Sequence, residues 1–324
     1  MGDSCTVDEL DLISIPAGTV WKGYLNLVSD GLGNKIALPI IVARGRSPGP
    51  IVGLTAAVHG NEINGLKVIH QVFKKLDLNN LYGIVVGLPV VNVPGYLLRQ
   101  REFNDRFDLN KKMPGAPNGN MSDIYCSRII EKIIRQVNYL VDLHTASFGR
   151  INSYYARADL SNPIIKQLAL LQNSQIILNN TGPSGTLRRA AIDLNIPSIT
   201  IELRDPHVIQ KEVVEESVTG IINILKELKM QPGEIVSAVK PAVICSRSYW
   251  LYTDEGGLLD VLPNLTEIVK KGDLIARVRS IFGEVIKEYF APEEGIVIGK
   301  STDPVNQTGS RIIHLGLVEQ QVRS

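Results

Sequence analysis

The sequence predicts an α/β fold, with a mixed sheet flanked by helices, followed by a small C-terminal all-β domain of the barrel-sandwich type. Strand and helix patterns alternate from about residue 50 to residue 230, which is typical of a sheet covered by helices on both faces. After Pro232 the chain carries short β patterns punctuated by Gly and Pro, without a long helix pattern. With 44% hydrophobic and 21% charged residues in 324, the composition is that of a globular protein.

The first 45 residues carry strand patterns. Residues 20–27 (VWKGYLNL) and 35–45 (KIALPIIVARG) contain β-branched alternation, and DGLGN between them predicts a hairpin-like turn. Residues 50–60 (PIVGLTAAVHG) are almost continuously apolar, which indicates a strand buried on both faces. The helical stripe of NEINGLKVIHQVFKKL follows at residues 61–76.

The alternation continues to residue 230. Further strands are predicted in segments 81–95, 139–146, 174–180 and 196–205. Further helices are predicted in segments 122–138, capped by Ser122 or Asp123, 163–172, 187–194 and 207–229. Residues 99–121 are polar and rich in Gly, Pro and Asn, which predicts a loop.

The change of pattern near Pro232 predicts two domains. Residues 1–231 form the α/β domain, which includes the N-terminal strands of residues 1–45, and residues 232–324 form the β-rich domain. Within the second domain, VKKGDLIARV and EEGIVIGK resemble the two halves of a lipoyl- or biotinyl-type barrel. We expect this domain to cover the cleft of the first.

Charge and hydropathy exclude several classes of function. The net charge is +1, from 34 basic and 33 acidic residues, so a nucleic-acid partner is not expected. No apolar run approaches the roughly 20 residues that span a bilayer, and the acidic N-terminal segment lacks the features of a secretory signal. The cysteines Cys5, Cys126 and Cys245 are scattered and make neither a disulfide framework nor a thiolate metal cluster. We therefore expect a cytoplasmic protein.

Two histidines and a glutamate stand at strand ends, where α/β sheets collect functional groups. His59 follows one buried strand, Glu62 lies three residues later, and His144 ends another buried strand. This His₂Glu set has the composition of a catalytic zinc site with one open position. Asp142 lies on the same side of its strand as His144 and could orient that ligand. The alternative is that H-x-x-E arises by chance and that these histidines are only hydrogen-bonded.

Glu202 ends the buried strand IPSITIE, where an ionised group needs a partner or a cleft. In a metal hydrolase, a glutamate here would take a proton from the attacking water and pass it to the leaving nitrogen. The alternative is a structural ion pair with Arg204 or Arg188. The basic loop RQREFNDRFDLNKKMPG could hold a substrate carboxylate or polarise a carbonyl, or could simply be solvated.

Four motifs in order resemble the succinylglutamate desuccinylase/aspartoacylase family of the zinc carboxypeptidase-like superfamily. They are AAVHGNEINGLKVI, the R-x-F-x-D-x-x-DLN segment, VDLHTA and IPSITIEL, and the resemblance covers residues 45–315. It implies the corresponding α/β fold and a hydrolase with one Zn²⁺ per chain that cuts an amide bond. It also implies that His59, Glu62 and His144 are the ligands and that Glu202 is catalytic.

The resemblance also assigns substrate roles. Arg101 matches the arginine that polarises the scissile carbonyl, with Arg99 close enough to compete, and Asn110 matches an asparagine that holds the substrate carboxylate. The family usually has DLNR, but here Lys111 replaces the arginine, and a lysine lacks the bidentate geometry. Arg204 stands where many relatives have glycine and could supply a replacement charge.

The predicted function is therefore a zinc-dependent amidohydrolase that removes an acyl group from an N-acylated amino acid or amine. Its expected partner is a small N-acyl substrate, and the sequence leaves a homo-oligomer open. A metallocarboxypeptidase acting on short peptides is the alternative enzyme. A carrier with a lipoyl or biotinyl lysine, for which Lys287 is poorly placed, and a metal-binding protein without turnover are the alternatives of another class.

Overall fold

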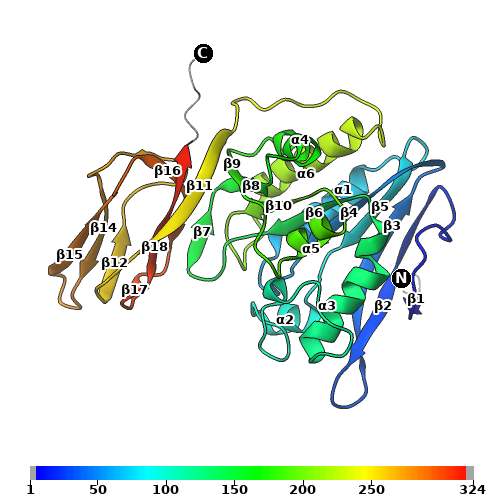
Figure 1. The fold of residues 1–324 in the computed structure, drawn as a ribbon, viewed down its shortest axis with the longest axis horizontal. Helices are drawn as coiled ribbons and strands as arrows, with labels where there is room; N and C mark the ends of the chain where they lie inside the picture. Colours follow the sequence, from blue (N-terminus) through cyan, green and yellow to red (C-terminus); the bar gives the residue numbers. More distant parts are fainter. Residues whose placement is uncertain (1–4, 319–324) are drawn as a thin grey trace.

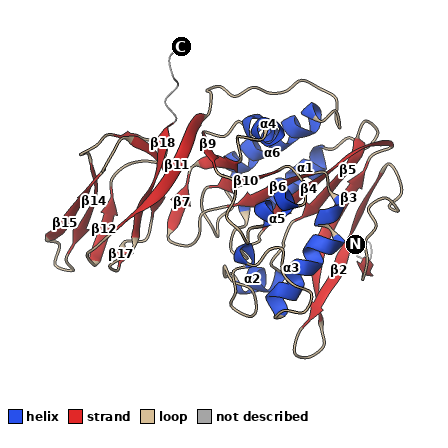
Figure 2. Cartoon of the chain, in the orientation of Figure 1, coloured by secondary structure: helices blue, strands red, loops and turns tan. Residues whose placement is uncertain are grey.

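A single large mixed sheet runs through the computed structural model, which describes residues 5–318 (Figures 1 and 2). In order across this sheet the strands are β1 (Cys5–Val7), β2 (Thr19–Ser29), β3 (Lys35–Arg44), β5 (Tyr82–Leu88), β4 (Ser47–Ala56), β6 (Tyr139–His144), β10 (Ser198–Leu203), β8 (Tyr154–Ala158), β9 (Ile176–Asn179), β11 (Val243–Tyr252), β18 (Arg311–Val318), β16 (Gly295–Ser301) and β13 (Ile268–Val269). β7 (Arg150–Asn152) pairs with β16. The predicted α/β fold with a mixed sheet is confirmed.

The centre of the sheet is parallel. β4 pairs in parallel with β5 and β6, and β6 pairs in parallel with β10. The carboxyl ends of these strands therefore meet at one edge of the sheet, which is where ligands bind in open α/β sheets. The N-terminal strands β2 and β3 form the predicted antiparallel hairpin around residues 30–34.

Helices cover both faces of this central region (Figure 2). One face carries α1 (Asn64–Lys75), α4 (Pro163–Leu171) and α6 (Lys211–Glu227), whose apolar residues share one core. The other face carries α3 (Met121–Lys132) and α5 (Leu187–Asp193), which belong to a second core. The short helix α2 (Val93–Leu98) and the 3₁₀ turns η1 (Leu109–Lys111) and η2 (Ile134–Gln136) lie in connections.

Helix α1 shows why the pattern produces this layer. Val68, Ile69 and Val72 repeat at helical spacing and are fully buried against the sheet. Burying one such side chain contributes about 1.5–3 kcal/mol. The basic residues Lys74 and Lys75 occupy the last turn, where they favour the negative end of the helix dipole.

Two local predictions are wrong. The helix predicted over residues 122–138 ends at Lys132, and its N-cap is Asn120, whose side chain accepts a hydrogen bond from the Asp123 amide. Asp123 occupies the third helical position and closes a capping box instead of capping the helix itself. Strands β7 and β8 occupy residues 150–152 and 154–158, where no strand is predicted although the YYARA segment is β-prone.

The C-terminal strands make two antiparallel layers. β11, β18, β16 and β13 continue the large sheet, and a second sheet contains β15 (Val285–Phe290), β14 (Leu274–Arg279), β12 (Gly257–Val261) and β17 (Val305–Asn306). Apolar residues of both layers form one core between them. β11 pairs in parallel with β9, so the sheet is continuous past the irregular segment 231–242. Within residues 5–318, the helices lack the length and apolar character needed to cross a membrane.

Candidate active site

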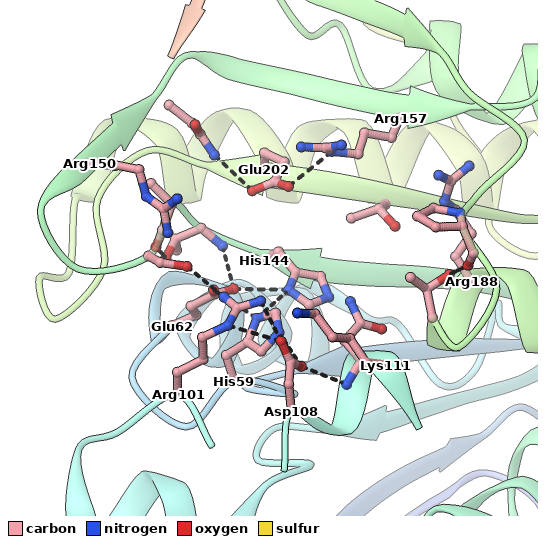
Figure 3. Close-up of a pocket in the computed structure, with 18 of the residues that line it drawn as sticks. His59, Glu62, Arg101, Asp108, Lys111, His144, Arg150, Arg157, Arg188 and Glu202 are labelled. Atoms are coloured by element: carbon pink, nitrogen blue, oxygen red, sulfur yellow. Dashed lines mark hydrogen bonds and ion pairs between the residues drawn. The ribbon is translucent and has the colours of Figure 1, made fainter. Parts of the chain in front are cut away.

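Two imidazoles and one carboxylate meet at the carboxyl edge of the central strands (Figure 3). His59 and Glu62 lie in the loop between β4 and α1, and His144 is the last residue of β6. All three side chains are buried, and one potential ligand atom from each lies within 4.8 Å of the others. The structure therefore gathers the three residues that the sequence selects as metal ligands.

The ligand atoms face one another closely. Glu62 places Oε1 at 2.8 Å from His59 Nδ1 and Oε2 at 2.9 Å from His144 Nδ1, and the two Nδ1 atoms are 3.2 Å apart. The backbone N–H of Thr145 also donates to Glu62 Oε2 at 3.0 Å. Both histidines thus present the same ring nitrogen to one point, and the carboxylate spans them.

The outer nitrogens of both rings contact carboxylates. His59 Nε2 lies 3.1 Å from Asp108 Oδ1, and His144 Nε2 lies 2.8 Å from Asp142 Oδ2. Thr55 donates its hydroxyl to the other oxygen of Asp142 at 2.7 Å. A carboxylate behind each imidazole favours the tautomer with a proton on Nε2, which leaves Nδ1 free as a ligand. Asp142 therefore has the contact expected of it, whereas Asp108, the first residue of the DLN motif, was given no role from the sequence.

The charges favour a cation at this centre. Burial raises the pKa of Glu62, but His59 and His144 outweigh burial and hold that pKa well below its ordinary value. Burial lowers the pKa of His144, but Asp142 and Glu62 outweigh it and raise that pKa well above its ordinary value. The surroundings therefore stabilise positive charge where the three ligand atoms converge.

A glycine makes the position of His59 possible. The loop after β4 packs against α2 so closely that a Cβ on Gly60 would lie 2.0 Å from the carbonyl carbon of Gly95. It would also lie 2.2 Å from the backbone nitrogen of Tyr96. Only a residue without a Cβ allows this approach.

Glu202 lies beside this centre on the neighbouring strand. It is the register partner of His144 in the parallel pair β6 and β10, and it is buried. Its Oε1 accepts a hydrogen bond from Arg157 Nε at 3.1 Å, and its Oε2 accepts one from Asn152 Nδ2 at 3.0 Å. The structural ion pair that was the alternative for Glu202 is thus present, but its partner is Arg157 and neither Arg204 nor Arg188.

Arg157 comes from the strand that the sequence pattern missed. β8 runs antiparallel to β10, and Glu202 is the register partner of Tyr155, two residues before Arg157. The Arg157 guanidinium also donates to the Tyr155 hydroxyl at 2.5 Å. Alternation along β8 therefore places Tyr155 and Arg157 on one face with Glu202. The signal available in the sequence was the β-prone YYARA segment.

Arg101 and Arg99 have different positions. Arg101 Nη1 lies 3.2 Å from Glu62 Oε1, and its Nε and Nη2 donate to Asp108 Oδ2 at 3.1 and 2.9 Å. Arg101 lines the cavity above the His–Glu–His centre. Arg99 is exposed, ends α2 in a left-handed conformation with φ 55°, and does not line that cavity.

The residues expected to bind substrate do not all lie at the cavity. Asn110 and Lys111 line the cavity, and Asn110 Oδ1 accepts the Leu187 amide at 2.8 Å, which ties η1 to the start of α5. Arg204 follows β10 in a left-handed conformation with φ 58° and does not line the cavity. Its charge acts on Asp205 and on Glu216 of α6, where it partly offsets the rise in the carboxyl pKa that burial causes.

The cavity at the His–Glu–His centre, which Arg101, Asn110, Lys111 and Glu202 also line, has a volume of about 400 Å³. Three acids line it, Glu62, Asp108 and Glu202, against six basic residues: Arg101, Lys111, Arg150, Arg157, Arg188 and Arg311. Trp250 and Arg311 come from β11 and β18, so strands distant in the sequence complete the wall. Motif spacing could not identify Arg150, Trp250 or Arg311, because only the sheet pairing brings them to the site.

Comparison of the chain with known protein families assigns it to one of them. Residues 48–228 match the family model described as the succinylglutamate desuccinylase/aspartoacylase catalytic domain. The chain therefore belongs to the succinylglutamate desuccinylase/aspartoacylase family and is a homologue of deacylases.

Individual relatives are distant. The chain is 21% identical over 304 residues, 89% of each chain, to the N-alpha-acetyl-L-2,4-diaminobutyric acid deacetylase of Halomonas elongata. A succinylglutamate desuccinylase structure from Silicibacter sp. TM1040 is 23% identical, with TM-score 0.83 and coverage of 94% of this chain and 98% of that one. The product-bound ectoine utilization protein EutE (DoeB) of Ruegeria pomeroyi is 21% identical, with TM-score 0.85 and the same coverage. These structures share the fold.

Proposed function

We propose that this protein is a zinc-dependent amidohydrolase that removes an acyl group from an N-acylated amino acid or amine. The observation that carries the proposal is the convergence of His59, Glu62 and His144 beside the buried carboxylate of Glu202. Family membership supports deacylation, and the geometry supplies a metal-ligand set next to a base. Here the chemistry is a hydrolysis, in which water adds to the amide carbonyl and the C–N bond breaks.

The donor set suits zinc. Two neutral imidazoles and one carboxylate form a common three-ligand set of catalytic zinc, and each imidazole is backed by its own carboxylate. Without a cation, two Nδ1 atoms only 3.2 Å apart would compete for one proton. A bound Zn²⁺ would supply a Lewis acid that polarises the carbonyl and lowers the pKa of water.

Glu202 serves as the base and then as the acid. Each carboxylate oxygen accepts one hydrogen bond, from Arg157 or Asn152, and retains acceptor capacity for a proton of water. Glu202 takes that proton as the water oxygen bonds to the carbonyl carbon. It then passes the proton to the nitrogen as the C–N bond breaks, so that a carboxylic acid and an amine leave.

Arg101 stabilises the charge that develops on the carbonyl oxygen. Its guanidinium is held by Glu62 and Asp108 and lines the cavity, so it is oriented before substrate arrives. Arg99 is exposed outside this cavity, which favours Arg101 for the role.

Asn110, Lys111 and Arg188 offer a binding position for the carboxylate of an amino-acid product. Asn110 and Lys111 follow Asp108 on η1, and Arg188 projects from α5 toward the same side of the cavity (Figure 3). Arg188 is held by the Asn180 carbonyl and side-chain oxygens and has no carboxylate partner in residues 5–318. This arrangement replaces the bidentate arginine of the family motif with two separate cations.

The cavity favours a small substrate over a peptide. Its volume of about 400 Å³ is near the lower end of ligand pockets, and Trp250 and Arg311 of the C-terminal strands close one side. We propose that the segment from residue 232 onward acts as a second domain that limits access to the cleft. The small volume of the cavity and its closed side disfavour a metallocarboxypeptidase that accepts peptides in general.

The test combines metal analysis with an acyl-substrate panel. Purified protein is expected to contain one zinc per chain and to hydrolyse at least one N-acyl amino acid or amine faster than any short peptide. Glu202→Gln should retain zinc but lose turnover by 100-fold or more, about the scale of general acid–base catalysis. The control is Glu215→Gln on the exposed side of α6.

Two results would contradict the proposal. Near-wild-type turnover in Glu202→Gln would remove the assigned base. Faster cleavage of peptides than of N-acyl amino acids would favour the carboxypeptidase alternative.

A further inference from the structure

Strand β7 belongs to the first part of the chain but pairs with a C-terminal strand (Figure 1). It lies off the path of the large sheet and joins it by antiparallel pairing with β16, in which Asn152 is the register partner of Gly299. The next residue, Ser153, donates its backbone N–H to the Ile298 carbonyl at 2.7 Å. Strand β8 then begins two residues after Asn152 and pairs with β10. The chain therefore passes directly from β16 to the strand beside the candidate base.

The side chain of Asn152 lies between β16 and Glu202. It is buried, and its Nδ2 donates to Glu202 Oε2 at 3.0 Å. A carboxylate oxygen only accepts, so the amide must present its NH₂ group to Glu202 and its carbonyl oxygen elsewhere. A Cβ on Gly299 would lie 2.5 Å from that carbonyl oxygen, which is far inside van der Waals contact. The amide thus occupies space that a side chain on Gly299 would take.

Gly299 is needed for its small size and not for its backbone conformation. Its φ lies outside the left-handed region that favours glycine, so the backbone alone would admit other residues. The pairing of β16 with β18 shifts register between Val297 and Gly299, which marks a β-bulge. Bulges near active sites change the direction of a strand and its side chains. The bulge here comes directly before the glycine that contacts the Asn152 amide.

The other oxygen of Glu202 is also held by a group that depends on β16. Arg157 donates to Oε1 (Figure 3), and the same guanidinium donates to the Tyr155 hydroxyl at 2.5 Å. Tyr155 is fully buried, in an apolar cluster that it shares with Ile296 and Ile298 of β16. The packing of β16 therefore fixes the tyrosine to which the guanidinium is bound.

Two donors on two oxygens fix the orientation of the Glu202 carboxylate. A carboxylate held at one oxygen can still rotate, whereas donors from β7 and β8 hold both oxygens of Glu202. Catalytic groups depend on such support, because a displacement of about 1 Å can lower a rate about 100-fold. The contacts of β16 are therefore in a position to control the catalytic geometry.

From these contacts we infer that strand β16 of the C-terminal region positions Glu202, and that Gly299 does so by leaving room for the Asn152 amide. The inference rests on the proposed role of Glu202 as the base. It gives the C-terminal region a second role, in addition to limiting access to the cleft. Asn152 and Gly299 are positioning residues and take no part in proton transfer.

The kinetic test compares Asn152→Ala with Gly299→Ala. The substrate is the N-acyl amino acid that wild-type protein hydrolyses fastest in the panel described above. Each variant should lower kcat by about 10- to 100-fold, the scale of misplacing a catalytic group, with KM and zinc content unchanged. The control is Gly256→Ala, whose Cβ would meet its nearest atom at 3.4 Å and should leave kcat unchanged. Asn152→Ala only removes atoms, so it tests the amide even if Gly299→Ala does not fold.

The double variant shows whether Gly299 acts through Asn152. Removal of the amide frees the space that the new Cβ needs, so the double variant should have the same kcat as Asn152→Ala alone. Independent effects would instead multiply. A multiplied loss would mean that Gly299→Ala disturbs the sheet by itself, and it would overturn the inference. A raised KM with unchanged kcat in Asn152→Ala would also overturn it, because Asn152 would then bind substrate.

Crystal structures of the wild-type and Gly299→Ala proteins test the same inference without turnover. In the variant, Asn152 Nδ2 should lie beyond hydrogen-bond distance of Glu202 Oε2 and the carboxylate should be rotated, while β7 and β16 remain paired. Wild-type positions of both side chains in the variant would overturn the inference.

The outcomes separate this inference from the proposed function. Displacement of Glu202 in a protein that hydrolyses no N-acyl substrate would support the positioning by β16 and contradict the deacylase activity. Hydrolysis with an unchanged kcat in both single variants would overturn the inference and leave the deacylase activity in place.

Discussion

Asp142 Oδ2 lies 2.8 Å from His144 Nε2, and both residues are on the same face of β6. The contact fixes the tautomer that leaves Nδ1 toward Glu62, and Thr55 on β4 holds the other Asp142 oxygen. The strand that supplies a candidate ligand therefore also supplies the group that orients it. We therefore expect metal affinity to depend on a residue outside the proposed ligand set.

Asp142→Asn is expected to weaken zinc binding by about 10- to 100-fold, the range found for groups that orient metal ligands. The amide keeps the shape and can still accept from Thr55, so the fold should persist. Competition with a chromogenic chelator measures the affinity, and thermal unfolding checks the fold. An unchanged zinc affinity in a folded variant would show that the Asp142 contact does not tune the site.

Removal of the metal is expected to abolish turnover and to lower the thermal midpoint, because a ligand bound only by the folded state stabilises it by mass action. Dialysis against a chelator followed by calorimetry tests this, and added Zn²⁺ should restore both quantities. A chelator-treated protein, shown to be metal-free, that retained full activity would contradict metal dependence.

Arg157→Met is expected to lower kcat by about 100-fold, the effect of misplacing a catalytic group by a small distance. The variant leaves Glu202 Oε1 without its partner while Asn152 still holds Oε2. Arg157→Lys should recover part of kcat because it retains the charge. A KM effect with kcat unchanged would instead indicate that Arg157 binds substrate and does not orient the base.

Gly60→Ala is expected to destabilise the fold by about 1–3 kcal/mol, typical of inserting a methyl group into a packed site. The new Cβ would meet the backbone of Gly95, which a rotamer change cannot relieve. Urea unfolding measures the free energy, and Gly31→Ala, where a Cβ meets nothing within 4 Å, is the control. Equal stability of the two variants would show that the loop after β4 can shift.

His314 should make stability fall as pH decreases. Burial and the charges of Arg157 and Arg311 lower its pKa to about 3 in the folded state. In the unfolded chain the His314 imidazole takes up its proton near pH 6.5, so above that pH its contribution to the free energy of unfolding is fully present. The free energy of unfolding therefore decreases by about 1.4 kcal/mol for each pH unit as the pH falls from 6.5 toward 3.

Comparison with His314→Gln isolates this contribution. The difference in unfolding free energy between pH 7 and pH 5 should be smaller in the variant than in the wild-type protein. Identical pH dependence in both proteins would mean that His314 accepts a proton in the folded state.

Several features of the site were predictable because they depend on local pattern. Continuous apolar strands that end in His59 and His144 predict buried parallel strands with polar groups at their carboxyl ends. The position of Asp142 beside His144 could also be predicted, because residues two apart on a strand lie on the same side. The same reasoning fails for Arg157, because β8 is a short strand whose pairing with β10 depends on nonlocal contacts.

By itself, the sequence determined the α/β class, the β-rich C-terminal region and the three candidate ligands, because hydrophobic period and strand-end position are local properties. Only the tertiary structure decided which charges meet. Arg157 reaches Glu202 because β8 pairs antiparallel with β10. Arg311 lines the same cavity from a strand more than 100 residues after Glu202 in the chain. Such encounters arise from sheet pairing, which the spacing of residues along the chain does not encode.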